Sequence, residues 1–187
     1  MAQASSFRSG MVLEIDGDLW SISEAQLIQP GKGGAFVRTK LKNMKTERVV
    51  EKTFRSEEKV KDVRIEKKSM QFLYSDGENY YFMDQSSYEQ VTIDKGFLGN
   101  AVNFLLEGNN VDILFHEVTP VGIELPYFVN LKVVETEPGM KGDTVSGATK
   151  IAKLETGATV QVPLFIEEGE VLKIDTRTNE YVERVKA

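Results

Sequence analysis

The sequence predicts an all-β fold made of several small barrels or sandwiches, with one short helix. Short runs rich in β-branched and aromatic residues recur along the 187 residues. Turn signals built from Gly, Pro and Asp separate these runs at close spacing. Many short strands with frequent turns are typical of small barrels and sandwiches. Helical periodicity is confined to one segment, from about Phe97 to Leu106.

The first hairpin is predicted between Val12 and Ile28. Two strand-like runs flank Asp16-Gly17, and an Asp-Gly pair favours a tight two-residue turn because both positions tolerate positive φ. We therefore expect an antiparallel pair that turns at Asp16 and Gly17.

A glycine-rich tip is predicted after the second run, where the sequence reads Pro30-Gly31-Lys32-Gly33-Gly34. Glycine adds no side chain and Pro30 fixes its own φ, so the pattern predicts a narrow tip whose one large side chain is Lys32. A Walker-type phosphate loop would need Ser or Thr after the lysine and a following helix, and neither is present. An ordinary flexible hairpin with an exposed lysine is the alternative.

The strand after the tip is predicted to carry a basic face. Cations occupy every second position, at Arg38, Lys40 and Lys42. Phe36 shares their face, and the alternate positions are expected in the core: Val37, Thr39 and Leu41. A rise of about 3.3 Å per residue spaces the cations by about 6.6 Å, comparable with successive phosphates of a nucleic acid. The alternative is a solvated edge strand protected by lysines.

The charge of the chain is unevenly distributed. The net charge is -6, yet residues 1–64 carry 12 Lys and Arg against 9 Asp and Glu, whereas residues 65–127 carry 3 against 10 and residues 128–187 carry 8 against 10. A chain that is acidic overall and basic locally suits an oriented contact with RNA. These changes in charge along the chain, together with the turn signals, predict three domains: residues 1–64, 65–127 and 128–187.

The middle region is predicted to hold a second Asp-Gly turn and the helix. Asp76-Gly77 separates two strand-like runs. The helix is expected to end before Gly108-Asn109 and to bury one apolar face. That face is formed by Phe97, Leu98, Ala101, Val102 and Leu105.

Several function classes are disfavoured. The chain has no cysteine, so it has no disulfide, thiolate nucleophile or cysteine metal site. His116 is the one histidine, and an ordinary strand residue is a better interpretation than a general base. We expect no enzyme, catalytic residue, metal or cofactor. No apolar run approaches the roughly 20 residues of a membrane helix. With no secretory signal pattern either, we expect a cytoplasmic monomer without a membrane partner.

Three segments together resemble the bacterial elongation factor P family over essentially the whole chain. The first is PGKGGAFVRTKLKN with the later VEKTFRS, and the second is FLYSDGENYYFMD. The third contains PGMKGDTV and a family pattern of Lys-x-Ala-x4-Gly followed by Val-Pro. That pattern is matched by Lys150, Ala152, Gly157, Val162 and Pro163.

The resemblance implies a KOW/SH3-like N-terminal barrel followed by two OB-fold-like β-barrels, together shaped roughly like a tRNA. It implies a translation factor that binds the 70S ribosome between the peptidyl-tRNA (P) and exit (E) sites. The implied partners are P-site peptidyl-tRNA and rRNA, and the implied role is to relieve stalling at consecutive prolines.

The resemblance also implies roles for individual residues. Lys32 would be the tip residue, which lysine-type members often carry in an enzymatically extended form. The implied tRNA contacts are Pro30, Gly31, Gly33, Gly34, Arg38, Lys40 and Lys42. Gly142, Asp143 and Thr144 would read the exit-site codon, and Arg177 and Tyr181 would face tRNA or the small subunit. Gln29, before Pro30, stands where lysine is frequent in the family, so the resemblance does not indicate which enzyme would modify Lys32.

Two alternatives stay open. One is a paralogue of elongation factor P with a different niche. The other is a generic OB-fold RNA-binding protein, which would place basic and aromatic residues on its barrel faces. The acidic middle region disfavours the generic binder, and Trp20, Tyr80 and Tyr81 are better interpreted as core residues.

Overall fold

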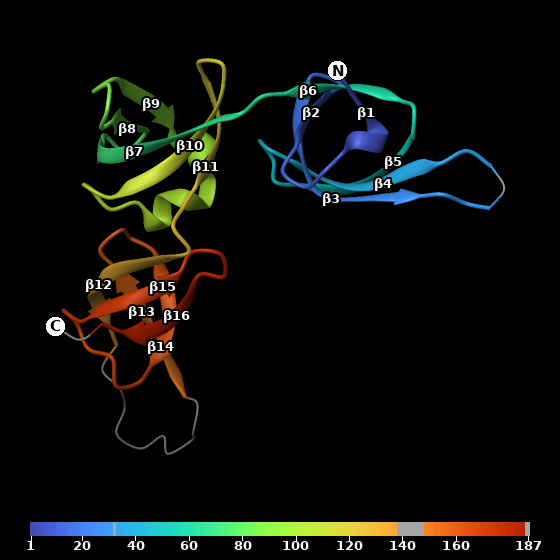
Figure 1. The fold of residues 1–187 in the computed structure, drawn as a ribbon. Coiled ribbons are helices and arrows are strands. Elements are labelled where there is room, and N and C mark those ends of the chain that lie inside the picture. Colours follow the sequence, from blue (N-terminus) through green and yellow to red (C-terminus); the bar gives the residue numbers. More distant parts are fainter. Residues whose placement is uncertain (32, 138–147, 186–187) are drawn as a thin grey trace. The chain divides into compact units, whose positions relative to one another are not determined.

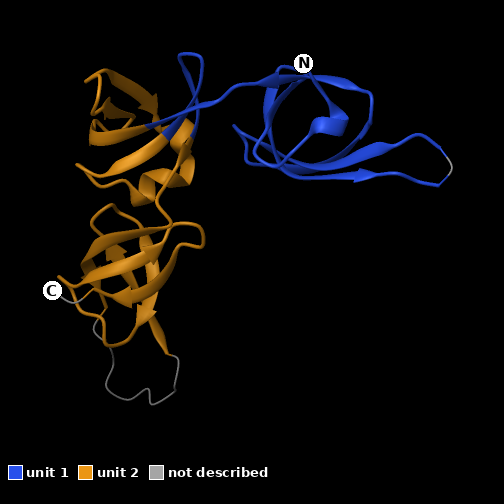
Figure 2. Ribbon diagram, viewed as in Figure 1, with its two compact units in different colours: residues 1–68, 113–122 blue, residues 69–112, 123–187 orange. Residues whose placement is uncertain are grey.

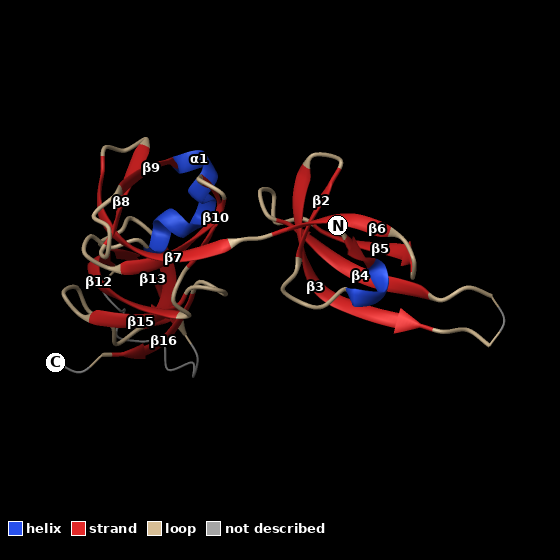
Figure 3. Cartoon of the chain, turned by 45° about the horizontal axis from the view of Figure 1, so that its top comes forward, coloured by secondary structure: helices blue, strands red, loops and turns tan. Residues whose placement is uncertain are grey.

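The computed structural model describes residues 1–31, 33–137 and 148–185. Strands dominate, and they form three sheets, as the sequence predicts (Figure 1). The helical elements in these residues are short (Figure 3). Across the described ranges, no helix is long and apolar enough to cross a membrane. The chain divides into two compact units, residues 1–68 with 113–122 and residues 69–112 with 123–187 (Figure 2).

The first sheet has six strands in the order β1-β6-β2-β3-β4-β5. They are β1 (Ala2–Gln3), β2 (Val12–Ile15), β3 (Asp18–Ile28), β4 (Phe36–Asn43), β5 (Val49–Arg55) and β6 (Lys59–Val63), with a 3-10 turn η1 (Ala4–Ser6) after β1. The inner face buries a core of Ala4, Phe7, Leu13, Ile22, Val37, Leu41 and Phe54.

The predicted turn at Asp16-Gly17 is confirmed. Ile15 and Asp18 are paired, so the hairpin loop has the two residues between them. Asp16 has φ 54° and Gly17 has φ 84°, the left-handed conformations that this turn type needs.

The second sheet has five strands in the order β11-β10-β7-β8-β9. They are β7 (Glu66–Ser75), β8 (Asn79–Asp84), β9 (Gln90–Asp94), β10 (Asn110–His116) and β11 (Thr119–Glu124). The predicted turn at Asp76-Gly77 joins β7 to β8. The Asp76 carboxylate accepts hydrogen bonds from the backbone N–H groups of Asn79 at 2.7 Å and Glu78 at 3.0 Å. These bonds lower the pKa of Asp76 to about 2.

The predicted short helix in the middle region is confirmed, but it begins two residues earlier than predicted and only its first turn is α-helical. The α-helix α1 covers only Lys95–Leu98, and a 3-10 helix η2 (Gly99–Phe104) follows it (Figure 3). Asp94 caps α1 by accepting a hydrogen bond from the Phe97 N–H at 3.0 Å, which starts the helix earlier than predicted. Gly99, at φ 53° and ψ -127°, lies outside the α region and ends the α-helix after one turn. The apolar spacing nevertheless buries Leu98 and Leu105 as expected.

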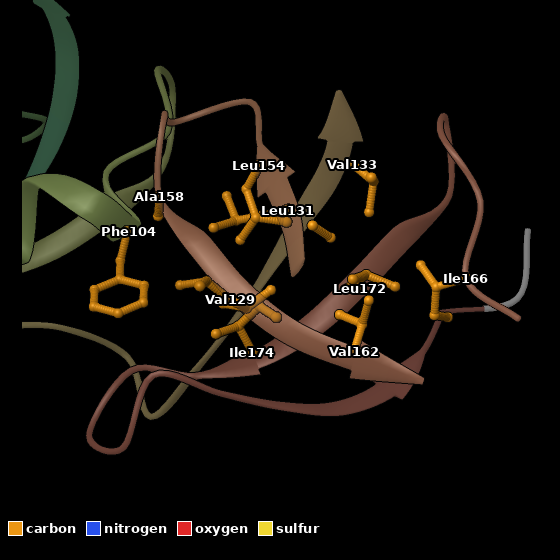
Figure 4. Packing of buried hydrophobic residues seen from close by; sticks show 12 residues of the cluster. Phe104, Val129, Leu131, Val133, Leu154, Ala158, Val162, Ile166, Leu172 and Ile174 are labelled. Carbon is orange, nitrogen blue, oxygen red and sulfur yellow. The ribbon is translucent and has the colours of Figure 1, made fainter. Parts of the chain in front are cut away.

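The third sheet has five strands in the order β14-β13-β12-β15-β16. They are β12 (Phe128–Thr136), β13 (Thr149–Leu154), β14 (Thr159–Pro163), β15 (Val171–Asp175) and β16 (Glu180–Arg184). Its core includes Phe104, the last residue of η2, which points toward the same interior as Val129 (Figure 4). The Thr156 hydroxyl also donates to the Asn103 carbonyl at 2.7 Å. The second unit therefore has a core to which η2 contributes directly.

Candidate nucleic-acid interface

The β3–β4 hairpin carries the glycine-rich tip and extends well beyond its neighbours in the first sheet (Figure 1). The ladder closes at the pair Ile28 and Phe36, so residues 29–35 form the loop. Gly33 has φ +109°, where a side chain would be strained, and nothing lies within 4 Å of a Cβ built on Gly31 or Gly34. The loop is therefore slender and open. Lys32 lies outside the described residues.

The predicted alternation along β4 is confirmed. Val37, Thr39 and Leu41 are buried, whereas Arg38 and Lys40 are exposed and Lys42 is half-buried. The Thr39 hydroxyl is satisfied by donating to the Lys52 carbonyl at 2.8 Å. β4 lies between β3 and β5, so the interpretation of this segment as a protected edge strand is wrong.

Two of the three predicted contact cations are already paired with acids. Lys40 Nζ lies 2.8 Å from Glu24 Oε2, and Lys42 Nζ lies 3.0 Å from Glu47 Oε1. The hydrogen bond from Lys40 lowers the pKa of Glu24, and the same bond raises the pKa of Lys40. Exposed pairs of this kind contribute little to stability, but they reduce the positive charge that β4 offers to a phosphate.

Arg38 differs from its two neighbours. Its cross-strand partners are Gln26 on β3 and Thr53 on β5, so no acid faces it. Within the described ranges, its guanidinium makes no ion pair and no hydrogen bond. A planar guanidinium with five N–H donors suits bidentate contact with phosphate. Arg38 is therefore the cation on β4 that is available to an external anion.

Arg177 is held internally in the third barrel. Its Nε and terminal nitrogen donate to the two Asp175 oxygens at 3.0 and 2.6 Å, and its backbone N–H donates to the same carboxylate at 2.9 Å. These bonds lower the pKa of Asp175 to about 2. The guanidinium also lies 4.8 Å from the centroid of the Tyr127 ring. The sequence prediction missed Asp175 and Tyr127, although the Asp-Thr-Arg spacing was a signal for such a turn.

The other predicted contact residues of the third region differ from Arg177 in their surroundings. Tyr181 pairs with Ile174 and packs, partly buried, against the barrel core. Gly142, Asp143 and Thr144 lie outside the described residues. In the part of the chain that the structure describes, no group of three or more His, Asp or Glu side chains could hold a metal ion. His116 is half-buried on β10.

Comparison with known families matches the three regions of the chain in order. The model described as "Elongation factor P (EF-P) KOW-like domain" matches residues 3–60. "Elongation factor P (EF-P) OB domain" matches residues 65–123, and "Elongation factor P, C-terminal" matches residues 129–184. The fold class predicted from the resemblance, a KOW-like barrel followed by OB-type barrels, is confirmed.

Relatives and solved structures agree with these matches. The chain is 53% identical over 184 residues to elongation factor P of Moorella thermoacetica, covering 98% of this chain and all of that protein. It is 54% identical over 186 residues to elongation factor P of Natranaerobius thermophilus, covering 100% and 99%. A solved structure described as eukaryotic translation initiation factor 5A from Methanococcus jannaschii aligns with a TM-score of 0.52 at 24% identity. That alignment covers 66% of this chain and 90% of the other, which indicates a shared fold.

Proposed function

This chain belongs to the elongation factor P family of translation factors, and from that premise we propose that it binds the 70S ribosome between the P and E sites. There it contacts P-site peptidyl-tRNA and rRNA and stimulates peptide-bond formation at consecutive prolines. It acts by positioning its partners, with no catalytic residue and no cofactor of its own.

The shape of the β3–β4 hairpin is the observation that carries this proposal. Residues 29–35 form an open loop in which Gly33 adopts φ +109° and the flanking glycines add no bulk. Such a loop fits into a confined space that an ordinary side-chain-bearing turn would not enter. Lys32 stands between Gly31 and Gly33 in the sequence, and we assign it as the group presented to the tRNA.

The mechanism needs only modest energies. Proline is a hindered nucleophile, and a nascent polyproline segment is stiff, so the reacting groups are poorly placed. Holding reactants in a productive pose contributes up to about 7–11 kcal/mol in ideal cases. A 10²-fold rescue needs about 2.7 kcal/mol, which a few charge-assisted hydrogen bonds to phosphate or ribose supply.

The contacts divide between the two ends of the chain. On the hairpin, the tRNA contacts are Pro30, Gly31, Gly33, Gly34, Arg38, Lys40 and Lys42. Arg38 binds phosphate directly, whereas Lys40 and Lys42 must first exchange Glu24 and Glu47 for the RNA. In the third region, the ribosome and codon contacts are Gly142, Asp143, Thr144, Arg177 and Tyr181. The functional domains are residues 1–64, 65–127 and 128–187.

Replacing the tip lysine tests this function. We expect Lys32→Ala to lower translation of a triple-proline reporter to the level seen without the factor, because the contact at the reaction site is lost. Lys45→Ala, which removes one charge in the turn that follows β4, away from the glycine-rich loop, is the matched control and should retain rescue. Intact mass of the native protein shows whether Lys32 is extended by a modifying enzyme. Full rescue by Lys32→Ala would overturn the proposal.

A further inference from the structure

The outer face of the second sheet carries two tyrosines that stack on each other. Tyr74 on β7 pairs across the strands with Tyr81 on β8, and their ring centroids lie 4.5 Å apart at an interplanar angle of 19°. Phe82, the neighbour of Tyr81, is fully buried, so Tyr81 points to the opposite, outer face. Tyr74 remains 48% exposed in spite of the stack. The two rings therefore form an aromatic surface that is open to solvent.

Hydrogen bonds hold this pair in place. The Tyr81 hydroxyl donates to Asp76 Oδ2 at 3.0 Å. The Asp76 carboxylate is itself anchored in the β7–β8 turn by the backbone N–H groups of Asn79 and Glu78. The pKa of Asp76, lowered to about 2 chiefly by those backbone bonds, keeps this carboxylate ionised at neutral pH. The stacked pair is thus preorganised, and a negative charge lies beside it.

The strands around the pair carry acids but no cation. Residues 69–94 cover most of β7 together with β8, β9 and their loops, and they include no Lys, Arg or His. The acids among them are Asp76, Glu78, Asp84, Glu89 and Asp94. The register places uncharged side chains beside the tyrosines on the outer face: Gln71, Met83, Gln90 and Thr92. The surface therefore attracts cations and repels phosphate.

The exposed rings of the third region are already covered by cations of the chain itself. These pairs are Arg177 with Tyr127 at 4.8 Å from the ring centroid, Lys173 with Phe128 at 5.0 Å and Arg184 with Phe165 at 5.9 Å. Over residues 1–31, 33–137 and 148–185, no Lys or Arg lies over the ring of Tyr74 or Tyr81. Because the face of an aromatic ring attracts a cation, this pair is left for one that the chain does not supply.

We propose that the outer face of β7, β8 and β9 binds an arginine of a basic protein segment. The guanidinium of that arginine stacks on the exposed face of Tyr74, and the surrounding acids attract the other cations of the segment. This inference goes beyond the proposed function, which assigns no residue of the second sheet to a partner, and it does not rest on it.

The chemistry of this face selects the occupant. A planar guanidinium stacks on an aromatic ring and is more weakly hydrated than the compact ammonium group of lysine, so arginine is preferred. Nucleic acid is disfavoured, because its phosphates would meet the acids of residues 69–94. A second copy of this chain is disfavoured too, because each copy has a net charge of -6. A basic segment of another protein meets both the ring and the charge.

The test is a titration of the isotopically labelled full chain with a short peptide of Arg-Gly repeats at physiological salt, followed by nuclear magnetic resonance. We expect the amide signals of Tyr74, Tyr81 and Thr92 to shift. Tyr74→Ala should weaken binding by about threefold to fivefold, the loss expected for an exposed cation–π contact. Tyr74→Phe keeps a ring at this position and should bind within about twofold of the unaltered chain. A peptide of Lys-Gly repeats should bind about threefold more weakly than the arginine peptide.

Phe165→Ala is the matched control. It removes an exposed ring that Arg184 already covers, so it should change the affinity for the arginine peptide less than about twofold. The inference is overturned by shifts that map away from β7, β8 and β9, by equal binding of the two peptides, by equal losses in Tyr74→Ala and Phe165→Ala, or by no binding at millimolar peptide. Shifts of the same signals with single-stranded RNA, or on concentrating the chain alone, would also overturn it, because the occupant would then be RNA or a second copy.

Discussion

The two regions to which RNA contacts were assigned treat their arginines in opposite ways. Arg38, on the hairpin of the first unit, makes no ion pair with any described residue and faces Gln26 and Thr53. Arg177, in the second unit, is bound on one side by both oxygens of Asp175 and on another by the Tyr127 ring. The two arginines carry the same formal charge, but only the Arg38 guanidinium is available to an external anion. Nearby acids decide which cation can meet a phosphate.

The Arg177 turn also has a structural role. The hydroxyl of the intervening Thr176 donates to the Pro126 carbonyl at 2.7 Å, and its N–H donates to the Tyr127 carbonyl at 3.0 Å. The turn thereby holds the segment that leads into β12. In the free protein the Arg177 guanidinium is engaged by Asp175 and Tyr127, whereas Arg38 has no such partner among the described residues.

The largest predicted effect is on stability. It tests whether the second unit depends on the core that η2 and the third sheet form together. Phe104→Ala should lower the free energy of unfolding by about 3–5 kcal/mol, because a ring that is 5% exposed leaves a cavity in the third barrel. Phe165→Ala, at a ring that is 60% exposed, should change it by about 0.5 kcal/mol or less. Denaturant unfolding measures both. A loss of unfolding free energy in Phe104→Ala as small as that in Phe165→Ala would show that η2 does not belong to that core.

The next effect concerns the available arginine. Arg38→Ala should weaken ribosome binding by about tenfold and lower the slope of log affinity against log salt by about one, because one phosphate contact is lost. Lys40→Ala should have a smaller effect, since Glu24 already pairs with it. Binding measured over a series of salt concentrations separates the two. A Lys40→Ala loss as large as that of Arg38→Ala would contradict the assignment.

A third prediction concerns pH and the internally held turn. The pKa of Asp175 is lowered to about 2, against about 3.9 in an unfolded chain. A lowered carboxyl pKa stabilises the fold above the unfolded value, and this contribution is lost as pH falls from about 4 toward 2. Asp175→Asn should flatten the fall in unfolding free energy over that window. Asp76→Asn removes a separate carboxyl with a pKa of about 2 and should flatten it independently. An unchanged slope in Asp175→Asn would contradict the role of the turn.

The smallest predicted effect is an increase in ribosome affinity rather than a loss. Glu24→Gln removes the acid that faces Lys40, so Lys40 becomes available to phosphate. Ribosome affinity at low salt should rise a few-fold. Glu14→Gln, which removes the acid paired with Lys61 at 2.7 Å on the neighbouring β2–β6 pair, is the control and should leave affinity unchanged. A fall in affinity for Glu24→Gln would mean that the acid orders the hairpin rather than shielding it.

The sequence predicted features that depend on neighbouring residues. The turns at Asp16-Gly17 and Asp76-Gly77 and the buried alternation of β4 follow from local preference and period-two patterning. The ion pair between Lys40 and Glu24 was missed because it depends on strand register, which shifts between Ile22 and Glu24.

Other features depend on long-range packing or on one backbone angle. Phe104 was not assigned to the core of the third barrel, because nothing in its local pattern shows which sheet receives it. The change from α-helix to 3-10 helix after Leu98 was not predicted, because the period of the apolar residues does not reveal that Gly99 leaves the α region. Both features had to come from the structure.

The most direct test of the central claim is a cryo-electron microscopy map of the factor on ribosomes stalled at consecutive prolines. The account predicts density for the loop of residues 29–35 against the 3′ end of peptidyl-tRNA, with Lys32 nearest the reacting groups. A map in which that loop points into solvent, away from the tRNA, would contradict it.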